Sequence, residues 1–348
     1  MSTGNVFAGL SRGVPGRAAR DMTAVSSTFE DSENISASPS MQYAPDKFFL
    51  GVIGATINRS ESGERYAQGG VEIGVTDDRH VITVAGSRAG KGRSSIIPNM
   101  LRYRGSTIAI DPKGELATET AHARANSIGQ RVCVVDPFNI TADDLAPYRV
   151  RFNPMAMLHV DSPTLVVDCS LIADALVIAG GSDPHWDESA RSFVEGLLLH
   201  VTAWEGYEGR RNLVTVRELM TKGSTVRHGE EIITGMPGLR IEMEACAMLL
   251  DDESKEAGDE DARANIEELA GLIEAAAAEF FEKPDSERGS VLSTARRHLK
   301  FLDYPQLRKS LATDETGDDF DLTQLKTEAV GMSVYLCLPA GRMGTCAR

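Results

Sequence analysis

The stretch from His80 to Glu115 constrains the fold more than any other part of the chain. The short β-branched run Val81–Val84 is typical of a strand buried in a parallel sheet. The glycine-rich sequence AGSRAGKG follows at residues 85–92, and the residues after it can start a helix. A second apolar run, residues 106–110, ends on Asp111. This order of strand, glycine-rich turn, helix and strand predicts a phosphate-binding loop in an α/β protein.

The glycine-rich turn has the residue types that a bound phosphate needs. Gly86 and Gly90 let the backbone approach an anion, and a helix beginning near Gly92 directs its unpaired amides and its positive dipole end into the turn. Lys91 then reaches the outer phosphates. The pattern G-x-x-x-x-G-K-[ST] is met imperfectly, since Ala85 holds its first position and Gly92 replaces the hydroxyl that binds magnesium. The alternative is a glycine-rich turn with a surface lysine. The predicted nucleotide-binding residues are Ala85, Gly86, Ser87, Arg88, Ala89, Gly90, Lys91, Gly92 and Arg93.

Longer stretches around this turn resemble the nucleotide-binding domain of the VirD4/TraG type IV secretion coupling proteins. The matching segments are AGSRAGKGRSSIIPN, YRGSTIAIDPKGELA, VVDPF, RFNPM, HWDESARSFVEGLLLHV, SVLSTARRHLKFL and FDLTQLKTEAVGMSVYLCLP. The resemblance covers roughly residues 70–340. It implies an ATP- and Mg²⁺-dependent hexameric motor, related to FtsK and HerA, that feeds DNA or protein into a conjugation channel. Alanine at the first loop position and glycine after the lysine are both common in that family.

The predicted fold class is α/β. The resemblance implies a P-loop NTPase of the RecA/FtsK-like type, whose parallel sheet carries an inserted all-α subdomain. Residues 130–136 and 332–338 are expected as further strands, and residues 48–76 as a β-ribbon. We expect a disordered tail at 1–45, the first part of the nucleotide-binding domain with Walker A at 46–155, the all-α insert at 156–312, and a return to the nucleotide-binding domain at 313–348.

Lys91 and Asp111 are the candidate catalytic residues. In open α/β sheets the carboxyl ends of strands line the ligand crevice, so Asp111 is expected near the phosphates. It either holds a magnesium-bound water or caps the next helix, and the sequence favours neither. Pro98 is tolerated only in a first helical turn or at a kink, and we expect it near the first turn of the helix that follows the glycine-rich turn.

The insert offers interaction surfaces as well as core. An aromatic-rich stripe from Trp186 to Trp204 has helical spacing, which favours core packing over base stacking. Asp187 near the start of that helix suits the helix dipole. Residues 242–287 are strongly acidic and predict a solvated face or, alternatively, a protein-contacting one. DNA or relaxase contact is an open alternative for the basic residues Arg288, Arg296, Arg297, His298 and Lys300.

Composition narrows the function classes. A formal net charge of −15 excludes a general nucleic-acid coat, so any DNA contact is expected to be local. No metal site is predicted, because the five cysteines (Cys133, Cys169, Cys246, Cys337 and Cys346) are scattered without ligand spacing. They indicate reduced thiols in a cytoplasm. No segment has the apolar length that spans a bilayer, and the resemblance places the protein at the cytoplasmic face of the inner membrane.

The sequence after residue 338 lacks the apolar strand ending in Asp-Glu, the Walker B pair, that the resemblance leads us to expect. We therefore expect the sheet to be incomplete at its C-terminus and the chain to be truncated. Because phosphoryl transfer needs a positioned metal and water, hydrolysis should be weak or absent. The missing strand also implies that this polypeptide alone is poorly stable.

Three functions stay open from the sequence. The first is an ATP-binding coupling protein that brings DNA with its relaxase, or an effector protein, to the type IV secretion channel as a homo-hexamer. The second is a catalytically inactive nucleotide-binding remnant that acts only as an interaction module. The third, an unrelated P-loop kinase or transferase, is disfavoured by the long helical insert and the IDPKGEL segment.

Overall fold

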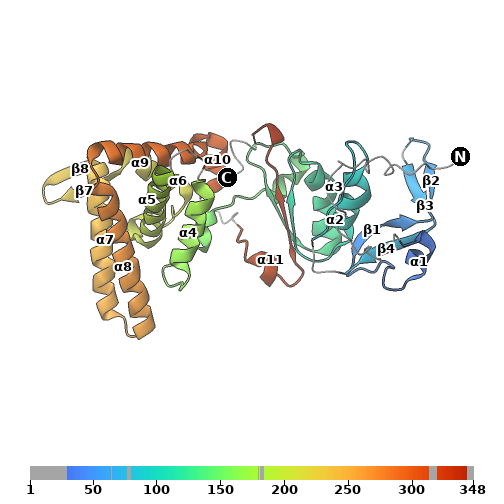
Figure 1. Ribbon diagram of the computed structural model, residues 1–348, viewed down its shortest axis with the longest axis horizontal. Coiled ribbons are helices and arrows are strands. Elements are labelled where there is room, and N and C mark those ends of the chain that lie inside the picture. Colours follow the sequence, from blue (N-terminus) through green and yellow to red (C-terminus); the bar gives the residue numbers. More distant parts are fainter. Residues whose placement is uncertain are drawn as a thin grey trace, which may run out of the picture. The chain divides into compact units, whose positions relative to one another are not determined.

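The structure is a computed structural model that describes residues 30–63, 65–76, 80–178, 180, 184–312 and 320–342. The chain divides into two compact units between His80 and Val81. Short antiparallel strands form the first unit. The second contains a parallel sheet and a large group of helices (Figure 1).

The first unit confirms the predicted β-ribbon. β1 (Phe48–Ile53) pairs antiparallel with β4 (Val71–Val75), with a bulge between Phe49 and Gly51. β2 (Thr56–Arg59) pairs antiparallel with β3 (Arg65–Gln68).

The disordered tail predicted for residues 1–45 is wrong for its last part. α1 (Ser32–Ala37) is a helix, and Gln42 forms an antiparallel bridge with Ile73 of β4. Backbone hydrogen bonds to a neighbouring strand order this segment despite its polar composition. Residues 1–29 lie outside the described residues.

The second unit is built on a parallel sheet. β5 (Thr107–Ile110), β9 (Met332–Leu336) and β6 (Arg131–Val135) lie in the order β5-β9-β6. The predicted strands at 106–110, 130–136 and 332–338 are therefore confirmed within a residue or two at each end. β9 comes last in the sequence and forms the middle of the sheet.

Both faces of the sheet are covered (Figure 1). α2 (Ile97–Arg102) and α3 (Glu115–Ala123) pack on one face, and α11 (Gln324–Thr327) with the residues before it packs on the other. Alternate residues of each strand enter the two cores. The buried residues of the first are Met100, Ala109, Ala117, Ala121, Val132, Val134, Leu145, Tyr335 and Cys337. Those of the second are Cys133, Val135, Phe320, Met332 and Val334.

The strand predicted at Val81–Val84 is not a strand. The segment is irregular, and Ile82 and Val84 are 84% and 91% exposed. A strand needs backbone hydrogen bonds from a neighbour, and none of the described strands pairs with these residues. β5 lies at the edge of the described sheet, since the strand order is β5-β9-β6, and Ile108 and Ile110 on one of its faces are 53% and 64% exposed.

The insert between β6 and β9 is mainly helical. Its helices are α4 (Leu165–Leu176), α5 (Pro184–Ala203), α6 (Leu213–Lys222), α7 (Met236–Glu256), α8 (Glu260–Phe281), α9 (Asp285–His298) and α10 (Pro305–Leu311). α5 contacts α4, α6, α8 and α9, and its stripe of Ala190, Phe193, Leu197 and Val201 is buried. The core-packing interpretation of that stripe is confirmed.

Short 3₁₀- and π-helical turns connect these elements. The 3₁₀ turns are η3 (Asp143–Tyr148), η4 (Pro154–Met157), η5 (Glu205–Tyr207), η6 (Leu299–Asp303) and η7 (Ala340–Arg342). The π-type turns are η1 (Gly92–Ile96) and η2 (Arg124–Ile128).

The insert is not entirely α-helical as predicted, because it contains a β-hairpin. β7 (Ser224–His228) pairs antiparallel with β8 (Glu231–Gly235). Gly229 adopts a φ of 63° in the turn, which glycine tolerates best. The hairpin has no fully buried residue, so it lacks the apolar run that would have predicted it.

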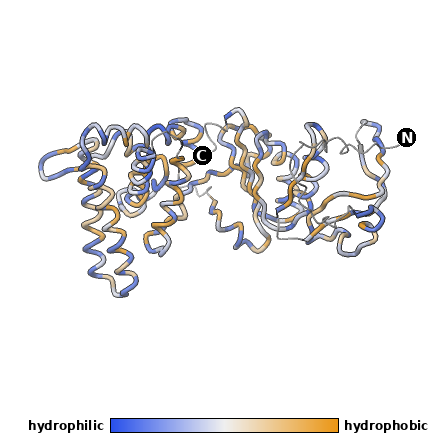
Figure 2. Tube along the Cα trace, viewed as in Figure 1, coloured by the Kyte–Doolittle hydropathy of each residue, from blue (hydrophilic) through white to orange (hydrophobic). Residues whose placement is uncertain are grey.

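The acidic stretch forms most of the antiparallel helices α7 and α8. α8 buries Leu269, Ile273 and Phe280, and Figure 2 shows hydrophilic residues where the two helices join. The solvated-face interpretation is confirmed for these exposed carboxylates, while a protein partner stays a prediction.

The core positions predicted for Cys133 and Cys337 are confirmed. Burial raises the pKa of the Cys133 thiol to about 11 and that of Cys337 to about 12. Cys169 and Cys246 are also buried and unpaired, and Cys346 lies outside the described residues.

Within the described ranges, every helix is too short or too polar to cross a bilayer.

Candidate functional site

The glycine-rich turn has the local shape that its sequence predicts. Arg88 and Gly90 adopt positive φ values of 61° and 86°, and Ala89 N donates to Gly86 O at 3.3 Å. η1 begins at Gly92, so its first amides have no partner within the helix. The turn and the helix start are present, although the strand expected before them is not.

Lys91 closes the turn on itself. Its Nζ donates to the carbonyl oxygens of Ala85 at 2.8 Å and Gly86 at 3.1 Å. Ser94 Oγ donates to Gly90 O at 2.8 Å, which fixes the turn to the first residues of the helix. An ammonium group at the start of a helix can exchange these carbonyls for phosphoryl oxygens.

The helix after the turn accommodates Pro98 as expected. α2 starts at Ile97, directly after the π-type turn η1, so Pro98 falls in the first turn of α2. The candidate residues 85–93 run from the turn into η1, and Ala85 to Gly90 are exposed.

Asp111 acts as a helix cap. It is 3% exposed at the end of β5, and its Oδ2 accepts a hydrogen bond from Ala117 N of α3 at 2.9 Å. Asp111 N donates to Leu336 O at 3.0 Å, which extends the pairing with β9. Of the two roles that the sequence allowed, capping is the one that these contacts support.

Asp111 and the glycine-rich turn are not joined by any polar contact. In the described structure, Asp111 makes no hydrogen bond or ion pair with residues 85–93. Glu115 is exposed and pairs with Lys113 at 3.6 Å. Among the residues that the structure describes, no group of three His, Cys, Asp or Glu side chains lies close enough together to hold a metal ion. The groups of the turn that could hold a phosphate are its backbone amides and the Lys91 ammonium.

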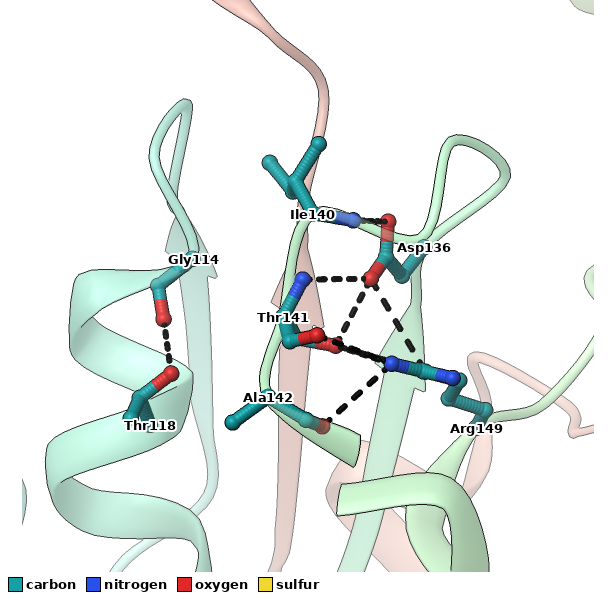
Figure 3. A network of polar contacts seen from close by, with 7 residues as sticks. All are labelled: Gly114, Thr118, Asp136, Ile140, Thr141, Ala142 and Arg149. Atoms are coloured by element: carbon teal, nitrogen blue, oxygen red, sulfur yellow. Dashed lines mark hydrogen bonds and ion pairs between the residues drawn. The ribbon is translucent and has the colours of Figure 1, made fainter. Parts of the chain in front are cut away.

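A second polar network lies at the carboxyl end of β6, and the sequence analysis missed it (Figure 3). Asp136 accepts hydrogen bonds from Ile140 N at 3.0 Å, Thr141 N at 2.9 Å and Thr141 Oγ1 at 2.7 Å. Arg149 Nε lies 3.8 Å from Asp136 Oδ2, and the Asp136 side chain is fully buried. The apolar strand ending in Asp-Pro was the available signal, because it repeats the pattern of Asp111-Pro112.

The loops after β5 and β6 pack closely at this end of the sheet. Gly114 adopts a φ of 71°, and a Cβ there would lie 3.0 Å from Thr141 Cγ2 and 3.3 Å from Ile140 O. Thr118 Oγ1 donates to Gly114 O at 2.6 Å in the first turn of α3 (Figure 3). Glycine is therefore needed at this position for both backbone conformation and space.

Most of the predicted basic cluster is occupied by contacts within the chain. Arg296 Nε donates to Met220 O at 2.8 Å, and Arg288 pairs with Asp285. Arg297 and His298 both contact Asp187 Oδ1, at 3.3 and 3.0 Å. These contacts have structural roles, and a DNA or relaxase contact by the cluster stays a prediction.

Asp187 does more than complement a helix dipole. Its side chain is 4% exposed and shares Oδ1 between the Arg297 guanidinium and the His298 ring. It thereby ties the start of α5 to the end of α9.

The parallel sheet fits a P-loop NTPase-like fold, and comparison with known families identifies the family. Residues 27–347 match the family model described as type IV secretory system conjugative DNA transfer. The chain belongs to this family. The resemblance to VirD4/TraG coupling proteins is therefore confirmed.

Individual relatives with the names TraG and VirD4 match parts of the chain. A conjugal transfer protein TraG from Escherichia coli is 26% identical over 259 residues, which cover 74% of this chain and 35% of that protein. The coupling protein VirD4 of Bartonella quintana is 27% identical over 154 residues, covering 42% of this chain and 23% of that protein. A 45-residue segment is 51% identical to protein VirD4 of Agrobacterium fabrum, covering 13% of this chain and 7% of that protein. The chain thus spans about a third of the length of the TraG relatives that it matches.

Proposed function

We propose that this chain is the nucleotide-binding part of a type IV secretion coupling protein that uses ATP to bring DNA to the secretion channel. The single observation that carries the proposal is the family match over residues 27–347. The names of the TraG and VirD4 relatives support it, since they refer to conjugal transfer and type IV secretion coupling. The glycine-rich turn at the start of η1 supports the ATP-binding part.

ATP would be held by the turn between Ala85 and Arg93. The first amides of η1 and the positive φ at Gly90 suit the close approach of phosphoryl oxygens to the backbone. Lys91 would leave the carbonyls of Ala85 and Gly86 and bind the outer phosphates. Asp111 would hold α3 against the sheet and keep the rim of this end of the sheet in place.

Bound Mg²⁺ would neutralise phosphate charge during hydrolysis. The described residues supply no cluster of ligands for it, so we assign no step to the metal.

The finer features of the family belong to the same proposal. They are a RecA/FtsK-like sheet, assembly as a homo-hexamer, and work at the cytoplasmic face of the inner membrane. The partners would be channel subunits and either a relaxase-bound DNA or an effector protein.

Two observations favour a second candidate function, a nucleotide-binding module that does not hydrolyse ATP. The segment Val81–Val84 is not paired in a sheet, and no acidic cluster accompanies Asp111 among the described residues. Such a module would bind ATP and act through protein contacts.

The test is ATP binding and hydrolysis by the purified chain and by Lys91→Ala. Removing a charge-assisted contact of this kind costs about 1.5–3 kcal/mol, so we expect ATP affinity to fall by at least about tenfold, measured by calorimetry. Lys326→Ala, an exposed lysine in α11, is the matched control and should leave ATP affinity unchanged.

Hydrolysis decides between the two candidates. ATP turnover that is lost in Lys91→Ala supports the motor, while binding without turnover supports the non-hydrolysing module. Absence of ATP binding by the wild-type chain contradicts both.

A further inference from the structure

A recess of about 390 Å³ lies beside the network of Figure 3, at the carboxyl end of β6. One wall is the loop from Asp136 to Arg151, and the other is α10, which contributes Gln306 and Lys309. The two walls are joined by a backbone hydrogen bond from Phe152 N to Ser310 O at 2.9 Å. Its volume is within the range of pockets that bind small molecules.

The side chains of the recess carry an excess of positive charge. Arg149, Arg151 and Lys309 line it, together with the single carboxylate of Asp136. That carboxylate already accepts three hydrogen bonds from the turn 140–141, so it is committed to the protein. In a chain with a net charge of −15, a local basic recess suits an anionic ligand.

Arg149 is held in position before any ligand arrives. Its Nη2 donates to Thr141 O at 2.9 Å, Thr141 Oγ1 at 3.2 Å and Ala142 O at 3.3 Å, while Nε faces Asp136. These bonds leave Nη1 out of the network as described. A guanidinium fixed in this way loses little entropy when it binds an oxyanion.

The donor set favours phosphate over a carboxylate. A phosphate group presents several oxygens in different directions, and it can accept from an arginine, a lysine and an amide at the same time. Gln306 and Asn139 supply such amides at the rim. Arg342, which follows β9, lies 4.7 Å from the centre of the Phe138 ring, so a further cation borders the loop that forms the recess.

We propose that this recess is a second phosphate-binding site, distinct from the glycine-rich turn, which takes a phosphate group of a nucleotide or of a DNA backbone. The site does not require ATP binding at the turn, so its failure would leave the proposed function intact.

The experiment measures pyrophosphate binding by calorimetry at low ionic strength, in the full chain carrying Lys91→Ala to weaken the turn. Three further substitutions are compared in that background: Lys309→Ala, Lys309→Arg and the control Lys326→Ala. Lys309 and Lys326 are both exposed, so neither change disturbs the core.

Lys309→Ala should weaken pyrophosphate binding about tenfold, because one charge-assisted contact is lost. Lys309→Arg should retain affinity, and Lys326→Ala should have no effect. Absence of pyrophosphate binding in the Lys91→Ala chain overturns the proposal, and so does equal weakening by Lys309→Ala and Lys326→Ala.

Two further titrations identify the source of the phosphate. If Lys309→Ala weakens the binding of a single-stranded oligonucleotide, the site contacts a DNA backbone. If it weakens ATP binding instead, the site takes a nucleotide. Loss of pyrophosphate affinity with neither change contradicts both sources and overturns the assignment to a nucleotide or a DNA backbone.

Discussion

The sheet and the helical insert each bury a charged side chain, and each satisfies it in a different way. In the sheet, Arg124 is completely buried at the end opposite the candidate site. It donates to the carbonyl oxygens of Tyr103 and Gly105 at 2.9 Å, to that of Met100, and to the side chains of Gln130 and Ser333. No carboxylate is among these partners.

In the insert, Glu242 of α7 is a buried carboxylate. It accepts hydrogen bonds from His200 Nε2 at 2.9 Å and from the hydroxyls of Tyr207 and Ser224. Burial alone would raise the pKa of Glu242, but the hydrogen bonds from His200, Ser224 and Tyr207 outweigh it and hold the pKa below the ordinary value.

The difference shows how the stability of each region depends on its buried charged group. Arg124 spreads one positive charge over three backbone carbonyls and two side chains, so it connects chain segments that are far apart in sequence. Burial lowers its pKa, but a guanidinium stays protonated in proteins. Glu242 joins α5, β7 and α7 through a group that can be neutralised by acid. The contrast predicts different responses of the two regions to mutation and pH.

The largest effect is expected for Arg124→Met. The substitution removes the guanidinium that donates to the carbonyl oxygens of Met100 and Tyr103 and to the Ser333 hydroxyl, so the free energy of unfolding should fall by about 3 kcal/mol or more. Urea denaturation measures it. Lys113→Met, at an exposed position, should change stability by less than about 0.5 kcal/mol. Equal losses in both variants would contradict the special role of Arg124.

Glu242→Gln should have the next largest effect. The amide keeps one acceptor oxygen but places an NH₂ group against hydroxyl and imidazole donors, at a cost of about 1–3 kcal/mol in unfolding free energy. The matched control is Glu244→Gln on the same helix, where an exposed pair with Arg240 is worth at most about 0.5 kcal/mol. A stability loss in Glu244→Gln as large as in Glu242→Gln would sink this assignment.

Acid should reduce the difference between wild type and Glu242→Gln. Because the folded-state pKa of Glu242 is lowered, its stabilisation is present above the unfolded value of about 4.3 and is lost as pH falls through the folded pKa. Unfolding free energies of the two proteins, measured between pH 7 and pH 3, should therefore converge. A gap that stays constant over this range would mean that the carboxylate charge contributes nothing.

The smallest effect is expected for Tyr335→Phe in β9. The change removes one buried hydrogen bond, between the Tyr335 hydroxyl and Thr120 Oγ1 at 2.6 Å, and should cost about 1 kcal/mol. Tyr304→Phe, at a 40% exposed position, is the control and should be neutral in thermal unfolding. If both variants melt at the same temperature, the hydroxyl of Tyr335 adds no stability.

Sequence patterns predicted much of this architecture because they are local. The runs that became β5, β6 and β9 are apolar enough to indicate buried strands, and the spacing of Ala190, Phe193 and Leu197 indicates a helix packed on one side. The turn at residues 85–92 was also recognisable from the sequence, because its glycines allow positive φ values and a lysine follows Gly90.

The rest depends on neighbours that are distant in sequence. Val81–Val84 has a strand composition, but only hydrogen bonds from another strand would make it one. The recess beside β6 joins Arg149 to Lys309, and no sequence spacing shows that they line one cavity. Asp187 looked like an ordinary first-turn acid until its contacts with Arg297 and His298 were visible.

The central position of β9 has a consequence for synthesis on the ribosome. β5 and β6 do not pair with each other, and the hydrogen bond from Met332 N to Ser106 Oγ joins residues 226 positions apart. Both strands therefore emerge early, and the whole insert is translated before β9, the strand that pairs with each of them. The helices of the insert have mostly local contacts and can form during this interval, whereas the sheet closes only at the end. A pause or a chaperone at that stage would act on the sheet and not on the insert.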